Sequence, residues 1–230
     1  MIRAAHAKRI ATAAAYGGGG VVGAGAAAFG LAYAQGRYAR NQIGVRRKSA
    51  PYADGLYGPR KSGTSARFVM LGDSLAAGLG AGAARNTPGA MLAQGISNVL
   101  DQPVRYMNAA TVGARSADLG VQVDRALHLR PQIAAIIIGA NDVTHVGRPQ
   151  AAVGHLEDAI RRLRSAGCEV VVGTCPDVGS VGPIPQPLRW VARTLSRQLA
   201  AAQMIAGVRA GAHVVSFADE LGPEFSADPD

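Results

Sequence analysis

The chain has 230 residues and a formal net charge of +9, and 48% of its residues are hydrophobic. Residues 1–66 contain ten Lys or Arg residues and one acidic residue, Asp54, whereas residues 67–230 contain fourteen basic and fourteen acidic residues. The excess positive charge therefore belongs to the N-terminal segment. The neutral remainder offers no basic groove for nucleic acid, and it is long enough for one domain with a full-sized core.

An uncharged stretch at residues 10–34 follows three basic residues. A helix of this length spans a bilayer core of roughly 30 Å. The pattern favours a membrane anchor or a cleaved export signal with a cleavage site at 32–34, and an Ala/Gly-rich leader that does not insert is the alternative. We expect residues 1–35 to be such a signal or anchor, which would place the protein in a bacterial cell envelope rather than the cytoplasm.

Residues 36–66 are rich in basic residues, Pro and Gly, and they contain few apolar residues. This composition predicts a linker rather than a packed element. A basic strip beside an apolar helix favours anionic lipid head groups, so a membrane surface is the expected partner. Nucleic acid is the rival partner, but no DNA- or RNA-binding module accompanies the strip, and we expect no nucleic-acid binding.

The body, residues 67–230, alternates between short apolar runs and longer helical stretches. This alternation predicts an α/β fold with a parallel sheet covered on both faces. The two cysteines have no spacing typical of a metal site, and the chain shows no cofactor motif, so neither metal nor cofactor is expected. The predicted strands are 67–71, 104–108, 133–138, 169–174 and 213–217, and the predicted helices are 89–101, 116–129, 149–166 and 187–210.

Polar residues follow the first three predicted strands. Ser74 lies in a Gly-Asp-Ser-Leu turn, Gly113 lies in the segment after the second strand, and Asn141 lies in a Gly-Ala-Asn-Asp turn after the third. The carboxyl ends of parallel strands meet at one sheet edge, so we expect these residues to lie near one another. A serine on a strand-to-helix turn is typical of a nucleophile, because the following helix offers backbone N–H groups to an oxyanion.

These segments resemble the first three blocks of the SGNH (GDSL-type) hydrolase family, over about residues 67 to 225. The resemblance implies a flavodoxin-like three-layer α/β/α sandwich with a five-stranded parallel sheet. It also implies a serine esterase or lipase without cofactor. By position, Ser74 would attack an ester carbonyl, and Gly113 and Asn141 would hold the oxyanion.

The fourth block of that family, an Asp-x-x-His segment after the last strand, has no counterpart here. No histidine occurs in residues 218–230. We therefore expect the domain to be C-terminally incomplete and to lack the family's catalytic Asp and His. One internal Asp-x-x-His, from Asp142 to His145, follows the third block. We expect Asp142 to orient its loop and His145 to lie near the cleft mouth, with a role as surrogate base as the weaker alternative.

The sequence therefore predicts a carboxylic ester hydrolase acting on acyl esters such as lipids or acetylated glycans. The alternative is an inactive SGNH-fold protein that binds a ligand or partner without turnover. A dinucleotide-binding site at residues 78–83 is disfavoured, because these glycines begin several residues beyond the strand and no acid follows at the required distance.

Overall fold

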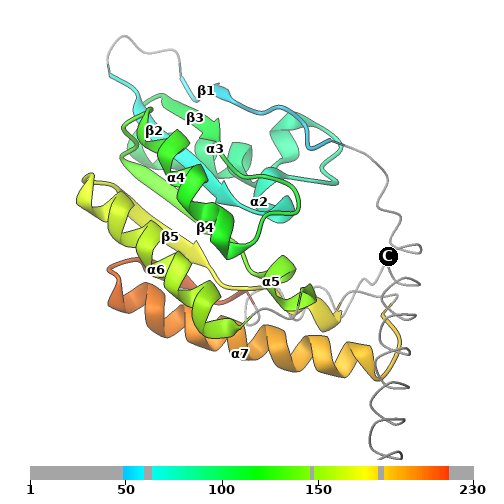
Figure 1. The fold of residues 1–230 in the computed structure, drawn as a ribbon. Helices are drawn as coiled ribbons and strands as arrows, with labels where there is room; N and C mark the ends of the chain where they lie inside the picture. Colours follow the sequence, from blue (N-terminus) through cyan, green and yellow to red (C-terminus); the bar gives the residue numbers. More distant parts are fainter. Residues whose placement is uncertain (1–48, 60–63, 146–147, 181–183, 218–230) are drawn as a thin grey trace, which may run out of the picture. The chain divides into compact units, whose positions relative to one another are not determined.

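A mixed sheet forms the centre of the molecule (Figure 1). The computed structural model describes residues 49–59, 64–145, 148–180 and 184–217. The helices and strands belong to the compact unit formed by residues 46–182 and 189–230, apart from the first residue of the last helix. The strands are β1 (Gly55–Tyr57), β2 (Ala66–Gly72), β3 (Val104–Asn108), β4 (Ile133–Ile137), β5 (Glu169–Gly173) and β6 (His213–Val215).

The strand order is β1-β3-β2-β4-β5-β6, and β2 to β6 run parallel. The predicted count of five strands is wrong by one, because β1 pairs antiparallel with β3 and places Gly55 opposite Tyr106. This strand lies within the segment predicted as a linker. Its three residues show no alternation in the sequence, and pairing with the exposed edge of β3 is what makes them a strand.

The helices lie close to their predicted positions, and the short ones beside the strand ends were not predicted. A single helical turn carries too little periodic signal to be recognised in a sequence. The α-helices are α2 (Ser74–Ala77), α3 (Pro88–Leu100), α4 (Leu119–Leu127), α5 (Ala140–Thr144), α6 (Pro149–Ser165) and α7 (Leu188–Arg209). Short 3₁₀ turns occur at η1 (Ala84–Asn86), η2 (Ser116–Asp118) and η3 (Val178–Ser180).

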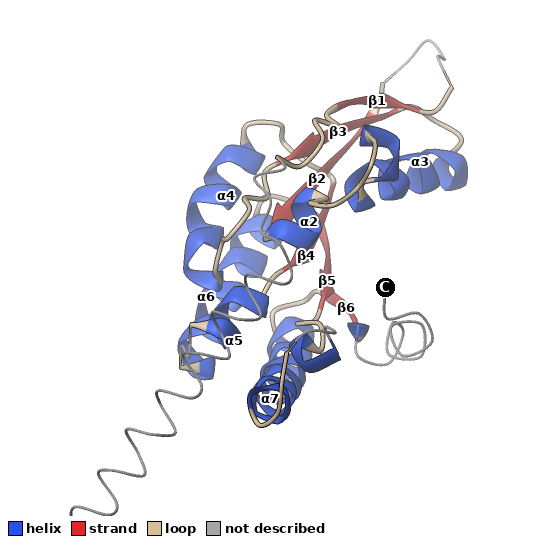
Figure 2. Ribbon diagram, turned by 90° about the vertical axis from the view of Figure 1, so that its right-hand side faces the viewer, coloured by secondary structure: helices blue, strands red, loops and turns tan. Residues whose placement is uncertain are grey.

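Helices cover both faces of the sheet (Figure 2). Along β2, Phe68 and Met70 pack in the cluster beneath α3, whereas Val69 and Leu71 pack in the cluster beneath α4 and α6. All four side chains are at most 1% exposed. A strand buried on both faces has no polar side, which explains its continuous apolar sequence. The predicted three-layer α/β/α arrangement is confirmed.

The strands that follow β2 in the sequence are added on opposite sides of it. β3 lies on one side of β2 and β4 on the other, so the strand order switches between β2 and β4. In open α/β sheets, ligands bind beyond the carboxyl ends of the strands at such a switch point. The segments after β2 and β4 are those that carry Ser74 and Asn141.

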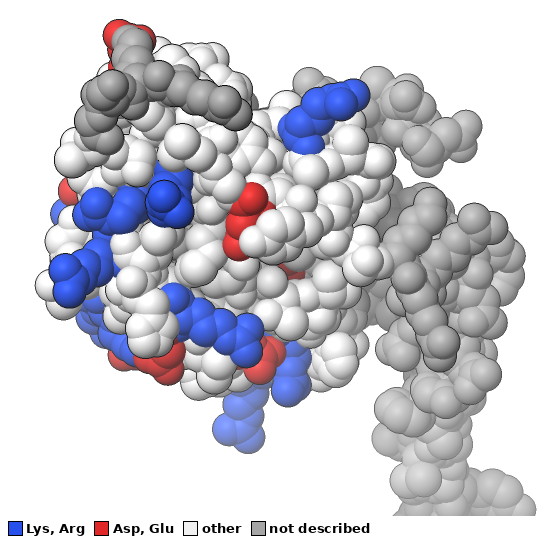
Figure 3. Space-filling model, turned by 90° about the horizontal axis from the view of Figure 1, so that it is seen from above, with Lys and Arg blue, Asp and Glu red and all other residues white. Residues whose placement is uncertain are grey.

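The face in Figure 3 is mostly uncharged, with acidic side chains among the basic ones. No helix within the described ranges is long and apolar enough to cross a membrane. The apolar stretch at residues 10–34 and the C-terminal residues 218–230 lie outside those ranges.

Tyr106 supplies a test of the core beneath α3. Its hydroxyl is buried and has no hydrogen-bond partner among the residues that the structure describes, and burial raises its pKa. The hydroxyl of Tyr57, by contrast, donates to the carbonyl oxygen of Ala53 at 2.5 Å. We expect Tyr106→Phe to raise the free energy of unfolding by about 1–2 kcal/mol, because it removes an unpaired buried polar group.

The matched control is Tyr57→Phe, which should lower the free energy of unfolding by about 1 kcal/mol through loss of a made hydrogen bond. Urea denaturation of both variants measures the two effects. Destabilisation of similar size in both would show that the Tyr106 hydroxyl is paired in solution.

Candidate active site

Gly72 ends β2 in a conformation that only glycine adopts easily. Its φ is +134°, and a Cβ atom there would lie 1.8 Å from the carbonyl oxygen of Ile137. The next residue, Asp73, donates its backbone N–H to that same oxygen at 3.1 Å. The turn after β2 is therefore fastened to the end of β4.

Ser74 opens α2 directly after this turn. Asp73 is the N-cap residue, and its Oδ1 accepts the N–H of Leu75 at 3.0 Å. Ser74 is half-buried, and its hydroxyl makes no hydrogen bond to any residue that the structure describes. The hydroxyl is thus positioned by a capped turn while it stays available to a ligand.

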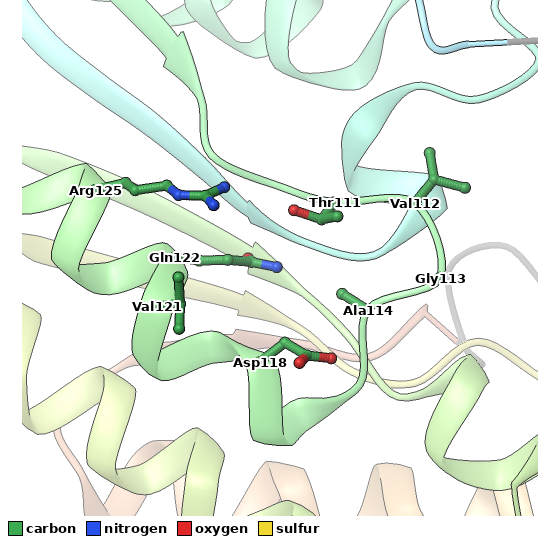
Figure 4. A pocket seen from close by; sticks show the side chains of 8 residues that line it. All are labelled: Thr111, Val112, Gly113, Ala114, Asp118, Val121, Gln122 and Arg125. Atoms are coloured by element: carbon green, nitrogen blue, oxygen red, sulfur yellow. The ribbon is translucent and has the colours of Figure 1, made fainter.

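Gly113 lies in the loop between β3 and η2, and its φ of +85° explains why a glycine is needed there. The loop is tied to the first block, because the N–H of Thr111 donates to the carbonyl oxygen of Gly72 at 3.0 Å. A pocket of about 300 Å³ lies between this loop and α4 (Figure 4). Val112 and Arg125 lie on opposite sides of it.

Asn141 lies in the first turn of α5, after β4. Its Nδ2 donates to the carbonyl oxygen of Ala114 at 2.9 Å, which joins the third block to the second. One amide hydrogen is used in this bond, and the second remains for another acceptor. The segments that carry Ser74, Gly113 and Asn141 are thus linked to one another by hydrogen bonds at one edge of the sheet.

Asp142 fastens the same region. Its carboxylate accepts the backbone N–H and the hydroxyl of Ser116, each at 3.0 Å. Asp142 was expected to orient its own loop, in the third block; the bonds of its carboxylate instead hold the loop of the second block.

Two buried glutamines, which the sequence analysis missed, hold the strand ends. The amide of Gln122 pairs with both backbone groups of Gly72: its Oε1 accepts the N–H at 2.7 Å, and its Nε2 donates to the carbonyl at 2.9 Å. Gln203 accepts the N–H of Cys175 at 2.7 Å and donates to the carbonyl of Ile138 at 3.0 Å.

A signal for Gln122 exists in the sequence. It shares the buried face of α4 with Leu119, Val123 and Ala126, so it is a polar residue at an apolar helical position. Such a residue must find hydrogen-bond partners inside the fold.

The histidines give Ser74 no base within the described ranges. His145 is exposed, and its Nδ1 lies 2.8 Å from the carbonyl oxygen of Asn141, one turn earlier in the chain. His128, His155 and His213 are also exposed. None of these four side chains is hydrogen-bonded to Ser74.

The pKa of Asp73 is raised from its ordinary value of 3.8 to about 6, chiefly by burial and to a smaller extent by the nearby charge of Asp142. Backbone N–H groups, foremost that of Leu75, oppose this rise. Near neutral pH, Asp73 is therefore a buried carboxylate held by backbone donors. Ionisation of Asp73 in this buried position lowers the folding stability. In return, the carboxylate holds the turn that carries the candidate nucleophile in a fixed conformation.

The two cysteines offer neither a nucleophile nor a metal ligand. Cys168 and Cys175 are free and buried, and burial raises the pKa of each thiol to about 12. Such thiols are poor nucleophiles and poor metal ligands at neutral pH. Among the residues that the structure describes, no group of three or more His, Cys, Asp or Glu side chains is arranged to hold a metal.

Comparisons with known proteins agree with this geometry. The family described as GDSL-like lipase/acylhydrolase matches residues 70–230 of the chain. The GDSL-like esterase Rv1075c of Mycobacterium tuberculosis is 37% identical over 211 residues, which cover 87% of this chain and 67% of that protein. The chain belongs to the GDSL-like lipase/acylhydrolase family. The resemblance inferred from the three sequence blocks is confirmed.

Solved structures of GDSL-like hydrolases share the fold at low sequence identity. A mutant of the esterase AlinE4 is 19% identical with a TM-score of 0.57, covering 74% of this chain and 86% of that chain. A lipase/acylhydrolase from Enterococcus faecalis is 21% identical with a TM-score of 0.55, covering 69% and 79% of the two chains. At this identity the likeness supports the fold alone.

The buried Asp73 predicts a pH effect on the stability of this GDSL-like protein. Its folded-state pKa is raised, so the folded state binds this proton more tightly than the unfolded state, and its contribution to stability falls as pH rises from about 4 to about 6. Between pH 4 and pH 7, the stability of wild type relative to Asp73→Asn should fall by about 2 kcal/mol.

Urea denaturation of both proteins at the two pH values measures this difference. Asp158→Asn is the control, because Asp158 is exposed on α6. It removes one carboxylate from the surface. A difference between Asp73→Asn and wild type that is the same at both pH values would mean that Asp73 ionises normally in the folded protein.

Proposed function

We propose that the protein hydrolyses carboxylic esters through a serine acyl-enzyme. Ser74 attacks the carbonyl carbon, the alcohol leaves with a proton, and water then releases the acid and regenerates the hydroxyl. Gly113, through its backbone N–H, and Asn141, through its side-chain amide, stabilise the negative charge on the carbonyl oxygen. Acyl esters such as lipids or acetylated glycans are the proposed substrates.

The observation that carries this proposal is the position of Ser74. It begins a capped helical turn at the switch point of the sheet, and its hydroxyl has no partner in the described structure. The second and third blocks are fastened to the same edge through Thr111 and Asn141. The pocket beside the Gly113 loop offers space for a portion of an ester.

The second candidate is a protein that binds ligand without turnover. The observation in its favour is that none of the four described histidines is hydrogen-bonded to Ser74. A serine hydroxyl without a positioned base is a weak nucleophile at neutral pH. A preformed oxyanion site and bound substrate alone still accelerate hydrolysis by about 10³–10⁴ over water in serine hydrolases that lack their triad.

Hydrolysis of p-nitrophenyl esters by the full chain tests the assignment. Ser74→Ala should remove turnover through the acyl-enzyme and leave at most the residual acceleration of about 10³–10⁴ over water, whereas Ser165→Ala, at the exposed end of α6, should change nothing. Asn141→Ala should lower kcat by about 10²–10³ with little effect on KM, the usual effect of losing one oxyanion donor. Unchanged turnover in Ser74→Ala would remove Ser74 as nucleophile, and a change confined to KM would place Asn141 in substrate binding.

A serine-directed fluorophosphonate label separates the enzyme from the binding protein. Slow labelling of Ser74 would indicate a site without a base and would support the binding protein. Rapid labelling that is lost in His145→Ala would identify His145 as the base and remove the second candidate. Rapid labelling that survives this substitution would show that a base lies elsewhere in the chain.

We also propose that the protein works in the cell envelope, exported or anchored by residues 1–35 and held at the membrane surface by the basic residues that follow. The uncharged stretch at 10–34, the basic residues before it and the attraction of the later basic residues to anionic head groups support this. Fractionation of bacteria that make the full chain should find it outside the cytoplasmic fraction. Deletion of residues 1–35 should return it to that fraction.

A further inference from the structure

A second cavity, of about 160 Å³, lies at the same sheet edge, between the segment after Gly113, α5 and the beginning of α6. Two arginines and two histidines line it together with three alanines and one aspartate. The lining residues are Arg115, Ala117, Asp142, His145, Arg148, Ala151, Ala152 and His155.

The two arginines of this cavity form no ion pair with an acid among the described residues. Arg115 and Arg148 are exposed, and neither guanidinium forms an ion pair or hydrogen bond there. The one acid in the lining, Asp142, forms no ion pair with either guanidinium, and its carboxylate accepts the N–H and the hydroxyl of Ser116. Asp118, close by in the chain, accepts the backbone N–H of Arg115 at 2.8 Å. The cavity therefore presents unpaired guanidinium groups to whatever enters it.

The walls of the cavity are continuous with the candidate oxyanion site. Arg115 follows Ala114, whose carbonyl oxygen accepts the Asn141 amide at 2.9 Å. On the other wall, the Nδ1 of His145 lies 2.8 Å from the carbonyl oxygen of Asn141. Asp142, which also lines the cavity, directly follows Asn141 in the chain. A group in this cavity therefore lies beside the segments that would hold the ester carbonyl.

Guanidinium groups bind phosphate and carboxylate oxygens through paired, charge-assisted hydrogen bonds. A small cavity with two unpaired guanidinium groups in its lining has room for one oxyanionic group and donors to hold it. We propose that this basic cavity binds the negatively charged group, phosphate or carboxylate, of an ester substrate. The proposal rests on the proposed function, and it narrows the substrate class to anionic esters, either soluble esters or lipids with an anionic head group.

Isothermal titration of the full chain with inorganic phosphate at fixed ionic strength tests the cavity without requiring turnover. The double variant Arg115→Gln/Arg148→Gln should bind phosphate about tenfold more weakly or worse. The matched control is Arg85→Gln/Arg105→Gln, which removes the same charge from exposed arginines outside the cavity and should bind nearly as wild type. Both variants keep the basic N-terminal segment, so its contribution cancels.

Equal phosphate binding by the two double variants, whether strong or weak, would overturn the proposal. A loss of phosphate binding confined to Arg115→Gln/Arg148→Gln supports it. Binding of the same variants to vesicles of phosphatidylcholine with phosphatidic acid then shows whether the anionic group belongs to a lipid or to a soluble ester. Selective loss of vesicle binding assigns the cavity to a lipid head group, and unchanged vesicle binding assigns it to soluble esters. If phosphate binding is selectively lost while no ester is hydrolysed by wild type, the cavity stands and the proposed function alone fails.

Discussion

The pairing of the Gln122 amide with both backbone groups of Gly72 is the contact on which the carboxyl edge of the sheet depends. Gly72 is the last residue of β2, and Gln122 is 2% exposed. A buried backbone N–H or carbonyl without a partner costs about 1–3 kcal/mol, so this pair of bonds fixes where β2 stops. The carbonyl of Gly72 also accepts the N–H of Thr111, which brings the loop of Gly113 to the same point.

Gln203 has the same role between the next two strands of the sheet. It is 1% exposed, and it bridges Ile138 after β4 to Cys175 after β5. The helices α4 and α7 thus hold the strand ends through single buried amides, and the functional turns project beyond these fixed points. Such an arrangement limits rearrangement of the edge, which is what preorganised stabilisation of a developing oxyanion requires.

Most of the fold was predictable from the sequence, because its strands and long helices carry strong periodic signals. The run at 133–138 and the helix of α6 are examples, each observed within a residue of the predicted ends. β1 was not predictable, since its three residues become a strand only by pairing with Tyr106 and its neighbours. For the site, the blocks predicted which segments meet, but not the bonds that join them. The bond from Asn141 to Ala114 depends on the loop conformation, which no local pattern reports.

The acidic side chains at the carboxyl edge of the sheet bond to donors inside the fold rather than to arginines at the surface. Asp73 and Asp142 direct their carboxylates at backbone and hydroxyl donors inside the fold, so neither serves a cation at the surface. Further along α6 the pattern is the ordinary one, since Glu157 pairs with Arg161 and with Arg209 of α7. The carboxylate of Asp142 is directed at Ser116 rather than at an arginine, and Arg115 and Arg148 remain without ion pairs among the described residues.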